Sequence, residues 1–433
     1  MRSRQVFSSA SPTFLISLAT MLLATAAWAA DTPKLIYSFA GDDDGEYTDT
    51  ELVADSAGNL YGSSVQGGLY GSGTVFQVTP AGVHTVLYSF TGGADGGEPY
   101  KGVTLDAQGN LYGTAVTGGG GTCEGGCGVV YKLTNNGGAW TQSVIHEFQG
   151  PHDGSGPGAP VSFDSHGRLY GTTPTGGGYG VGVVFQMIPT TSGGWRFVVI
   201  HTFTGGKDGS GGSAGRLLVD KAGNLYGACT VGGANGFGNV FRMSQNQGQW
   251  TFTPLYAFKD SPDAALPYGG LTQDKSGNLY GTTYYAGAND LGSVYTLQRI
   301  NGAWKEKVLY SFKGGTDGAS PISTLVADDA GNFYGTTSEG GAASCGCGVI
   351  FKLTRGATGW TESVVYSFPG TPDPGFAYNG MVRGSDGNLY GATVHGGSNN
   401  DGAIYRLTPQ AAGRLVVTDG AGFDQLLHRR DHH

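Results

Sequence analysis

The chain has 433 residues, of which 81 are glycine, 11% are aromatic and only 13% are charged, with a formal net charge of −9. The glycines show no three-residue period, which excludes a collagen-like fibre. An acidic chain without basic clusters is also a poor candidate for binding nucleic acid or an anionic membrane surface. The aromatic content is ample for a buried core, and the composition is that of an exported all-β protein.

The N-terminal segment predicts export. Arg2 and Arg4 precede an apolar stretch from Phe14 to Leu23, and small residues suited to cleavage follow, so residues 1–29 have the pattern of a secretory signal peptide. The apolar stretch is too short to span a bilayer with margin. We expect the mature chain to begin near Ala30 and to be soluble and secreted, to the periplasm or to the outside of the cell.

Two short motifs recur seven times in the rest of the chain. A Phe is followed five residues later by an Asp in the pairs Phe39/Asp44, Phe90/Asp95, Phe148/Asp153, Phe203/Asp208, Phe258/Asp263, Phe312/Asp317 and Phe368/Asp373. A Gly-Asn-Leu-Tyr-Gly-like pentad recurs at Tyr61, Tyr112, Tyr170, Tyr226, Tyr280, Tyr334 and Tyr390. The copies are 51 to 58 residues apart, a period typical of a propeller blade or a large solenoid turn.

Each repeat has the pattern of four short strands, which is clearest in the second repeat. There the strands are expected at Gly102–Asp106, Leu111–Ala115, Val129–Thr134 and Trp140–Phe148, separated by a tight turn, a glycine-rich loop and a Trp-bearing turn. The sequence therefore predicts an all-β fold in which residues 30–409 form one domain, a seven-bladed propeller of four-stranded blades.

The order of the motifs predicts how the ring closes. The phrase of the fourth strand occurs at Leu35–Phe39, before any other strand, whereas the last repeat ends near Thr408 without it. We expect the N-terminal strand to complete the last blade and remove the open edge. The alternative is that Arg414–Thr418 supplies this strand. We favour the N-terminal strand as the regular member, with Arg414–Thr418 added outside it or loosely docked, within a C-terminal strand and tail at 410–433.

Other recurring residues are predicted to build the fold. An Asp precedes a Gly-Asn or Gly-Arg by three residues and can accept hydrogen bonds from its own turn, at Asp55, Asp106, Asp164, Asp220, Asp274 and Asp328. The seventh repeat has Gly384 instead, so this Asp is not required. The third strand carries an aromatic that we expect in the core, namely Phe76, Tyr131, Phe185, Phe241, Tyr295, Phe351 and Tyr405.

Four phrases recur in this order through the repeats: Val-Leu-Tyr-Ser-Phe, Gly-Gly-x-Asp-Gly, Gly-Asn-Leu-Tyr-Gly-Thr-Thr and Cys-Gly-Val-Ile-Phe-Lys-Leu-Thr. From Lys34 to Pro409 the chain resembles the GloVer tandem-repeat family of bacterial exported proteins, whose copies carry various C-terminal sorting signals. The resemblance implies a secreted repeat protein without an assigned activity and offers no catalytic residue. The tail from Phe423 to His433 lacks a hydrophobic anchor or sorting motif, so surface attachment is not expected here.

The strand order places one recurring carboxylate per repeat on one face of the ring. If the first strand is innermost, the loops after strands two and four open together, on the face where ligands usually enter a propeller. The loop after strand four carries Asp44, Asp95, Asp153, Asp208, Asp263, Asp317 and Asp373. These residues are candidates for binding sugar hydroxyls or cations, calcium among them. The alternative, favoured by their presence in every repeat, is that each Asp caps its own turn.

Residues that differ between repeats are more informative about a site. At the entry to the first strand, three repeats carry Tyr, at Tyr100, Tyr268 and Tyr378. The other four repeats carry Asp49, Gly158, Ala214 and Ile322. Aromatic rings near carboxylates suit the apolar face and the hydroxyls of a sugar, so the three Tyr are candidate binding residues. The alternative is that their rings only cover loop backbone.

The five cysteines fall into two kinds. Cys123 and Cys127 share the strand-two loop of the second repeat, and Cys345 and Cys347 share the same loop of the sixth. In an exported protein each pair is predicted to close as a local disulfide. No zinc site is expected from them, because the two repeats stand apart in the ring and an oxidised pair cannot ligate. Cys229 is left over and is expected to be a buried thiol.

The chain has no Gly-x-Ser-x-Gly, His-Glu-x-x-His or phosphate-loop motif. The leading hypothesis is a secreted, monomeric, non-catalytic module that binds a glycan or an exported protein through the loop face, without a cofactor unless calcium is required. The alternative is a carbohydrate-active hydrolase or lyase with carboxylates at the central channel. Unequal carboxylates in a deep central pocket, one with a strongly raised pKa, would favour the enzyme, whereas exposed Tyr rings would favour binding.

Overall fold

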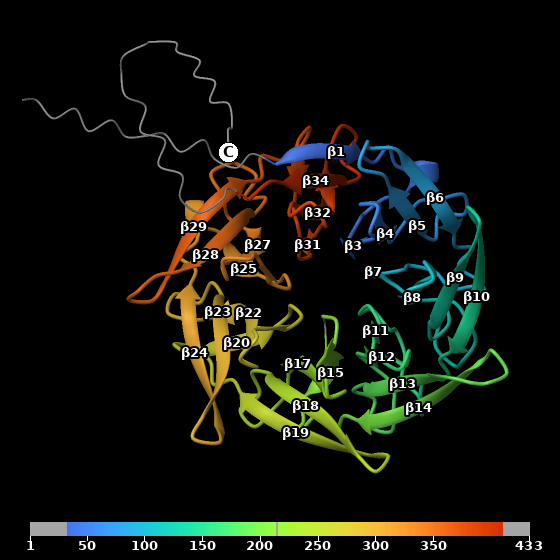
Figure 1. Cartoon of the computed structure of the whole chain (residues 1–433), viewed down its shortest axis with the longest axis horizontal. Coiled ribbons are helices and arrows are strands. Elements are labelled where there is room, and N and C mark those ends of the chain that lie inside the picture. The colour runs from blue at the N-terminus through green and yellow to red at the C-terminus, as the bar shows by residue number, and fades with distance from the viewer. Residues whose placement is uncertain (1–32, 214, 410–433) are drawn as a thin grey trace, which may run out of the picture. The chain divides into compact units, whose positions relative to one another are not determined.

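The chain folds as a ring of seven twisted β-sheets, one for each repeat (Figure 1). The computed structural model describes residues 33–213 and 215–409. Within these ranges the only helical segments are two 3-10 turns, η1 (Asp42–Asp44) and η2 (Gly315–Asp317). Each sheet extends outward from the centre of the ring, so the prediction of an all-β, seven-bladed propeller is confirmed.

The sheets are called blades 1 to 7 in chain order. Blade 1 consists of β3 (Val53–Ala54), β4 (Leu60–Ser64), β5 (Thr74–Val78) and β6 (His84–Ser89). Blade 2 consists of β7 (Lys101–Leu105), β8 (Leu111–Ala115), β9 (Val129–Asn136) and β10 (Ala139–Glu147), with β2 (Thr50–Glu51) pairing in parallel with β7. Blade 3 consists of β11 (Ser162–Phe163), β12 (Leu169–Thr173), β13 (Val183–Pro189) and β14 (Trp195–Thr202).

In blades 4 to 6 the innermost strand is split into two pieces, which pair with the same second strand. Blade 4 consists of β15 (Ser210–Ser213), β16 (Leu218–Val219), β17 (Leu225–Val231), β18 (Asn239–Asn246) and β19 (Gln249–Ala257). Blade 5 consists of β20 (Ala264–Pro267), β21 (Thr272–Gln273), β22 (Leu279–Ala286), β23 (Ser293–Ile300) and β24 (Ala303–Ser311). Blade 6 consists of β25 (Ala319–Pro321), β26 (Val326–Ala327), β27 (Phe333–Glu339), β28 (Val349–Arg355) and β29 (Trp360–Ser367).

Blade 7 joins the two ends of the ring. Its sheet consists of β31 (Val382–Arg383), β32 (Leu389–Thr393), β34 (Ala403–Leu407) and β1 (Lys34–Ser38), and β30 (Pro374–Gly375) pairs with β33 (His395–Gly396) beside it. The antiparallel register runs from Lys34 opposite Arg406 to Ser38 opposite Ala403. The predicted closure by the N-terminal strand is therefore confirmed. The predicted signal peptide at 1–29 and the rival strand in the tail lie outside the described residues.

The repeated aromatics and the pentad glycine pack against each other in the blade cores. In blade 2, Gly113 is the cross-strand partner of Tyr131, and a Cβ atom on that glycine would overlap the Tyr131 ring. The Phe90 ring meets Tyr131 edge-on at 5.0 Å. The third-strand aromatics and the motif Phe residues are fully buried in all seven blades, as predicted, so this pattern supplies the main hydrophobic stabilisation of the ring.

The Asp turns explain the Gly-Asn-Leu-Tyr signature. In blade 2, the Asp106 carboxylate accepts hydrogen bonds from the backbone N–H groups of Gln108 and Asn110, from the Asn110 side chain at 2.8 Å and from the Tyr112 hydroxyl at 3.2 Å. In blade 7, where the Asp is replaced, Asp386 accepts from Asn388 and Tyr390 instead. The signature residues thus satisfy one another's hydrogen-bonding groups within each turn.

A left-handed residue lies at the start of each innermost strand, before the strand in blades 1, 2, 3 and 7 and within its first piece in blades 4 to 6. Its φ lies between 53° and 63° in all seven blades, at Tyr47, Glu98, Gly156, Gly212, Leu266, Ser320 and Phe376. Five of the seven are not glycine, and each of those five costs of the order of 1 kcal/mol. In five blades the backbone N–H of this residue donates to a carbonyl in the strand-two loop of the preceding blade, at Ser72, Cys127, Phe237, Leu291 and Cys347. Neighbouring blades therefore fix where each innermost strand begins.

Candidate ligand-binding site

The starts of the innermost strands enclose a pocket of about 250 Å³ on the central axis. We call it the entry pocket, because it lies at the end of these strands that faces the glycine-rich loops. All seven blades contribute to its lining: Asp49, Glu51, Tyr100, Lys101, Pro160, Gly215, Tyr268, Gly269, Gly270, Ile322, Thr324, Tyr378 and Asn379. The three Tyr singled out in the sequence are thus brought together from blades 2, 5 and 7.

A cluster of three polar side chains forms one wall of the entry pocket. The Lys101 ammonium donates to both carboxylate oxygens of Asp49 at 2.9 Å and to the Asn379 side-chain carbonyl at 3.2 Å. The Asn379 amide donates in turn to Asp49. One cation and one anion balance each other here, and both are largely shielded from solvent. The cluster can therefore offer donors and acceptors to a neutral polar ligand without a net charge.

The three Tyr rings differ in exposure. Tyr268 is 45% exposed and lies 6.0 Å from the ring of Tyr284, whereas Tyr100 and Tyr378 are half-buried. Burial raises the pKa of Tyr100 and of Tyr378, and the Asp49 carboxylate adds to both shifts. These phenols stay neutral and able to donate hydrogen bonds in ordinary solution.

An ion pair across the axis forms the floor of the entry pocket. The Arg216 guanidinium of blade 4 donates to Glu51 of blade 1 at 3.3 Å and to backbone carbonyls of Val103 and Val161. The Thr324 hydroxyl donates to the other Glu51 oxygen at 2.9 Å. Because these contacts join several blades through the middle of the ring, they brace the channel and separate the entry pocket from the space beyond.

A second pocket of about 500 Å³ lies on the far side of this ion pair. It shares Glu51 and Thr324 with the entry pocket, but most of its wall is apolar, with Leu52, Leu217 and Met381 among the contributors. The channel therefore has a polar, aromatic half and an apolar half, and only the first contains the candidate binding residues.

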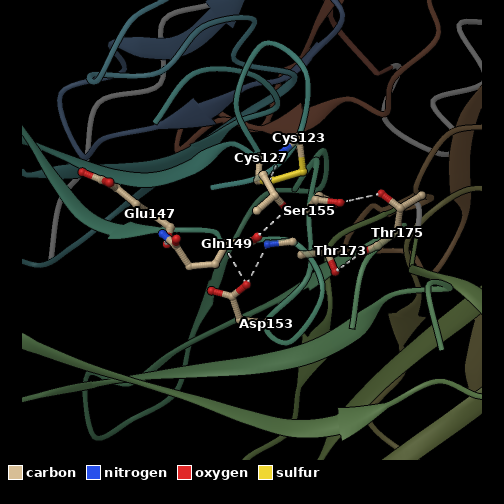
Figure 2. Close-up of a disulfide and its surroundings, with 10 residues drawn as sticks. Cys123, Cys127, Glu147, Gln149, Asp153, Ser155, Thr173 and Thr175 are labelled. Carbon is tan, nitrogen blue, oxygen red and sulfur yellow. Dashed lines mark hydrogen bonds between the residues drawn. A yellow bond between two sulfur atoms is a disulfide. The ribbon is translucent and has the colours of Figure 1, made fainter. Parts of the chain in front are cut away.

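The seven motif Asp residues do not line the entry pocket. They follow the outermost strands, and six of them accept hydrogen bonds within their own loops. Asp95, for example, accepts from the Tyr88 hydroxyl and from the Thr91 backbone, both at 2.9 Å. Figure 2 shows the equivalent Asp153, whose carboxylate accepts from the backbone of Gln149 and Gly150. The contacts of these residues are those of turn caps.

Metal binding is a further candidate role for these loops. Within the part of the chain that the structure describes, no group of three or more His, Cys, Asp or Glu side chains is placed to hold a metal ion.

Both predicted disulfides are present, and each supports a wall of the channel. Cys123 is bonded to Cys127, and Cys345 to Cys347, while Cys229 is a buried free thiol. The carbonyls of Cys127 and Cys347 are two of the acceptors that hold the left-handed residues, since they bind the N–H groups of Gly156 and Phe376. The disulfides thus restrain loops that position the innermost strands of blades 3 and 7.

Two carboxyl groups with strongly shifted pKa values lie on outermost strands, away from the entry pocket. Burial, reinforced by the neighbouring Asp263 carboxylate, raises the pKa of Glu306 to about 8. Burial and Asp317 likewise raise the pKa of Glu362 to about 7. The two carboxylates of the entry pocket, Asp49 and Glu51, are instead engaged by Lys101 and Arg216.

Sequence comparison of the repeats missed four residues of the site. Lys101 and Asn379 directly follow the Tyr positions that were singled out, and Glu51 and Arg216 stand one position further along their blades. Glu51 and Arg216 are the only charged residues at that position among the seven repeats. Comparing the repeats at the two positions after the Tyr position as well would have identified all four residues.

Comparison with known proteins places the chain among repeat proteins and propellers. A family model described as the Gloeobacter/Verrucomicrobia repeat matches residues 120–347. No match is found among curated proteins. Among the described residues, no helix is long and apolar enough to cross a membrane.

Several solved structures share the fold at low sequence identity. A candidate 6-phosphogluconolactonase from Bacteroides uniformis is 13% identical, with a TM-score of 0.52 over 77% of this chain and 88% of its own. A protein from Lactobacillus plantarum is 13% identical, with a TM-score of 0.51 over 77% and 87%. The extracellular domain of a candidate one-component system from B. thetaiotaomicron is 10% identical, with a TM-score of 0.50 over 85% and 39%. At these identities the likeness establishes the fold alone.

Proposed function

The chain belongs to the Gloeobacter/Verrucomicrobia repeat family, and we propose that it is an exported, monomeric, non-catalytic propeller that binds a glycan in the entry pocket. The observation that carries the proposal is the convergence of Tyr100, Tyr268 and Tyr378 on the Asp49–Lys101–Asn379 cluster. These residues come from four blades and have no counterpart in the remaining ones, so they are not needed to build the repeat.

The chemistry of the entry pocket suits a neutral sugar. A sugar ring has an apolar face that packs on an aromatic side chain and hydroxyls that both donate and accept hydrogen bonds. Tyr268 offers an exposed ring, Asp49 offers acceptors and Lys101 offers donors. A pocket of about 250 Å³ lies below the usual range for drug-sized ligands, which indicates room for about one sugar ring.

The alternative, a carbohydrate-active hydrolase or lyase, has less support. Such an enzyme needs a carboxylic acid that holds a proton near its substrate, usually paired with a second carboxylate. Both carboxylates of the entry pocket are paired with cations. The carboxyls with raised pKa values, Glu306 and Glu362, are on the outermost strands β24 and β29.

Two features support export. Closed disulfides persist in oxidising compartments and are rare in the cytosol, and this chain has two of them. The N-terminal pattern of a signal peptide agrees with this location.

A glycan array tests the proposed function. The mature protein is applied with and without calcium, beside a Tyr100→Ala/Tyr268→Ala double variant and a Tyr70→Ala control. Tyr70 is 58% exposed in a loop of blade 1 and does not line the entry pocket. We expect glycan binding that the control retains, that the double variant loses, and that does not depend on calcium.

Three outcomes would contradict the proposal. Unchanged binding by the double variant would remove the entry pocket as the site. Release of reducing sugar ends from a bound glycan would support the enzyme. Binding of an exported protein, with no glycan bound, would indicate that the partner is a protein and not a glycan.

A further inference from the structure

The wall of the entry pocket is uneven around the ring. Blades 2, 5 and 7 have a Tyr at the entry to the innermost strand, whereas blade 3 has Gly158 at the same position. Two residues earlier, blade 3 has Gly156, where blade 2 has Glu98 and blade 7 has Phe376. The Tyr side chain that three blades place at the entry pocket is therefore missing at blade 3.

This part of the wall has room for a Cβ atom at ordinary van der Waals distance from its neighbours. A Cβ atom at Gly158 would meet no neighbouring heavy atom closer than 3.9 Å, and the same holds for Gly156. The next lining residue of blade 3 is Pro160, which is buried and does not refill the gap. At the entry position the pocket thus has an aromatic ring in blades 2, 5 and 7 and no side chain in blade 3.

Polar side chains follow directly outside the gap. Thr175 of blade 3 is exposed and Ser155 is half-buried, and their hydroxyl oxygens are 2.9 Å apart (Figure 2). The backbone between them and the gap is held in place, because the Gly156 N–H donates to the carbonyl of Cys127 at 2.9 Å in the disulfide loop. A ligand that leaves the pocket at blade 3 therefore reaches fixed backbone and a pair of hydroxyls.

We propose that the ligand is an oligosaccharide chain, with one sugar unit in the entry pocket and the following units extending past Gly158 toward Ser155 and Thr175. This inference rests on the proposed function. The entry pocket has the volume for about one ring, and in blade 3 the position equivalent to Tyr100 carries no side chain that would block a glycosidic link to a second ring. Gly158 is then a specificity-determining residue that admits a chain where a Tyr would admit only a single unit.

The test adds the Tyr that other blades carry. Gly158→Tyr is compared with the wild type and with Gly178→Tyr, a matched control in an exposed loop of the same blade where the new Cβ also has space. The probes are neutral oligosaccharides of one to six units, β-1,4- and β-1,3-linked glucose and β-1,4-linked N-acetylglucosamine. Binding is measured by calorimetry, and circular dichroism checks that each variant is folded.

For the wild type and the Gly178→Tyr control, we expect the affinity to rise by about tenfold or more from one unit to four. In Gly158→Tyr the ratio between long and short probes should fall to about one. Equal affinity for short and long probes in the wild type, or an undiminished ratio in Gly158→Tyr, would overturn this inference while leaving the proposed function standing. Absence of binding by every probe would overturn both.

Discussion

The loops behind the outermost strands and the starts of the innermost strands follow opposite rules. In the outer loops nearly the same residues recur in every blade, and Asp95 and Asp153 make nearly the same contacts with their own turns. Around the entry pocket the equivalent positions hold unlike residues, such as Tyr268 in blade 5 and Gly158 in blade 3. A residue repeated in all blades serves the architecture that all blades share, whereas a site on the axis of a ring needs unlike groups.

Removing a repeated core residue is the largest expected effect. Phe203 is fully buried and packs against Phe241 and His201, so Phe203→Ala should lower the free energy of unfolding by about 3–5 kcal/mol. Urea unfolding measures the change. A loss below about 1 kcal/mol would mean that the repeated Phe is not part of the shared core.

Removing an unlike residue at the entry pocket should affect binding more than folding. Tyr268→Ala takes away an exposed aromatic face, so glycan affinity should fall by about tenfold while the free energy of unfolding changes by less than about 1 kcal/mol. Calorimetry and urea unfolding give the two values. Tyr285→Ala is the control, since Tyr285 is equally exposed in the same blade but does not line the pocket. Equal loss of affinity in both variants would contradict the claim that the residues of the entry pocket form the binding site.

Neutralising a repeated Asp should show the reverse pattern. Partial burial opposes ionisation of Asp95, but hydrogen bonds from Thr91 and Tyr88 outweigh it and lower the pKa of this carboxyl. Its contribution to stability is therefore present above its ordinary pKa of 3.8 and is lost as the pH falls through the lowered value. Asp95→Asn should cost about 1 kcal/mol at pH 7, less in acid, with glycan affinity unchanged. A loss of glycan binding would indicate instead that the seven motif Asp residues take part in binding the glycan.

The smallest expected effect concerns Glu306 on β24, an unlike residue outside the entry pocket. The Glu306 carboxyl faces Asp263 with Lys259 nearby, and burial raises its pKa from 4.5 to about 8. Stability from the protonated form is complete below pH 4.5 and is lost as the pH rises toward 8. Glu306→Gln should remove this loss and stabilise the protein at pH 8 relative to pH 5 by about 1 kcal/mol, after allowance for solvent screening. Thermal unfolding at the two pH values checks the sign; a variant that is less stable at pH 8 would contradict it.

Local repetition made most of the fold predictable. The strand order, the closure by Leu35–Phe39, the aromatic core and both disulfides follow from residues close together within one repeat. The left-handed residues were not predicted, because five of them are not glycine and carry no local signal for a positive φ. At four of these five residues the backbone N–H donates to a carbonyl of the preceding blade, which holds the conformation.

The candidate site was predictable only in part, for a physical reason. The three Tyr were identified because they break the repeat, and they do line one pocket. Their polar partners come from other blades: Asp49 meets Lys101 and Asn379 of the two neighbouring blades, 52 and 330 residues away in the chain, and Glu51 meets Arg216 across the ring, 165 residues away. Only the closed ring brings these groups together, and no pattern within a repeat encodes their pairing.

The location of a bound glycan tests the account most directly. A crystal structure of the mature protein with the glycan that binds most tightly on the array would show which residues touch the sugar. We predict one ring in the entry pocket against Tyr268, hydrogen-bonded to the Asp49–Lys101–Asn379 cluster. A glycan held instead by the outer loops, on carboxylates such as Asp95 and Asp153, would contradict the claim that the unlike residues, and not the repeated ones, form the binding site.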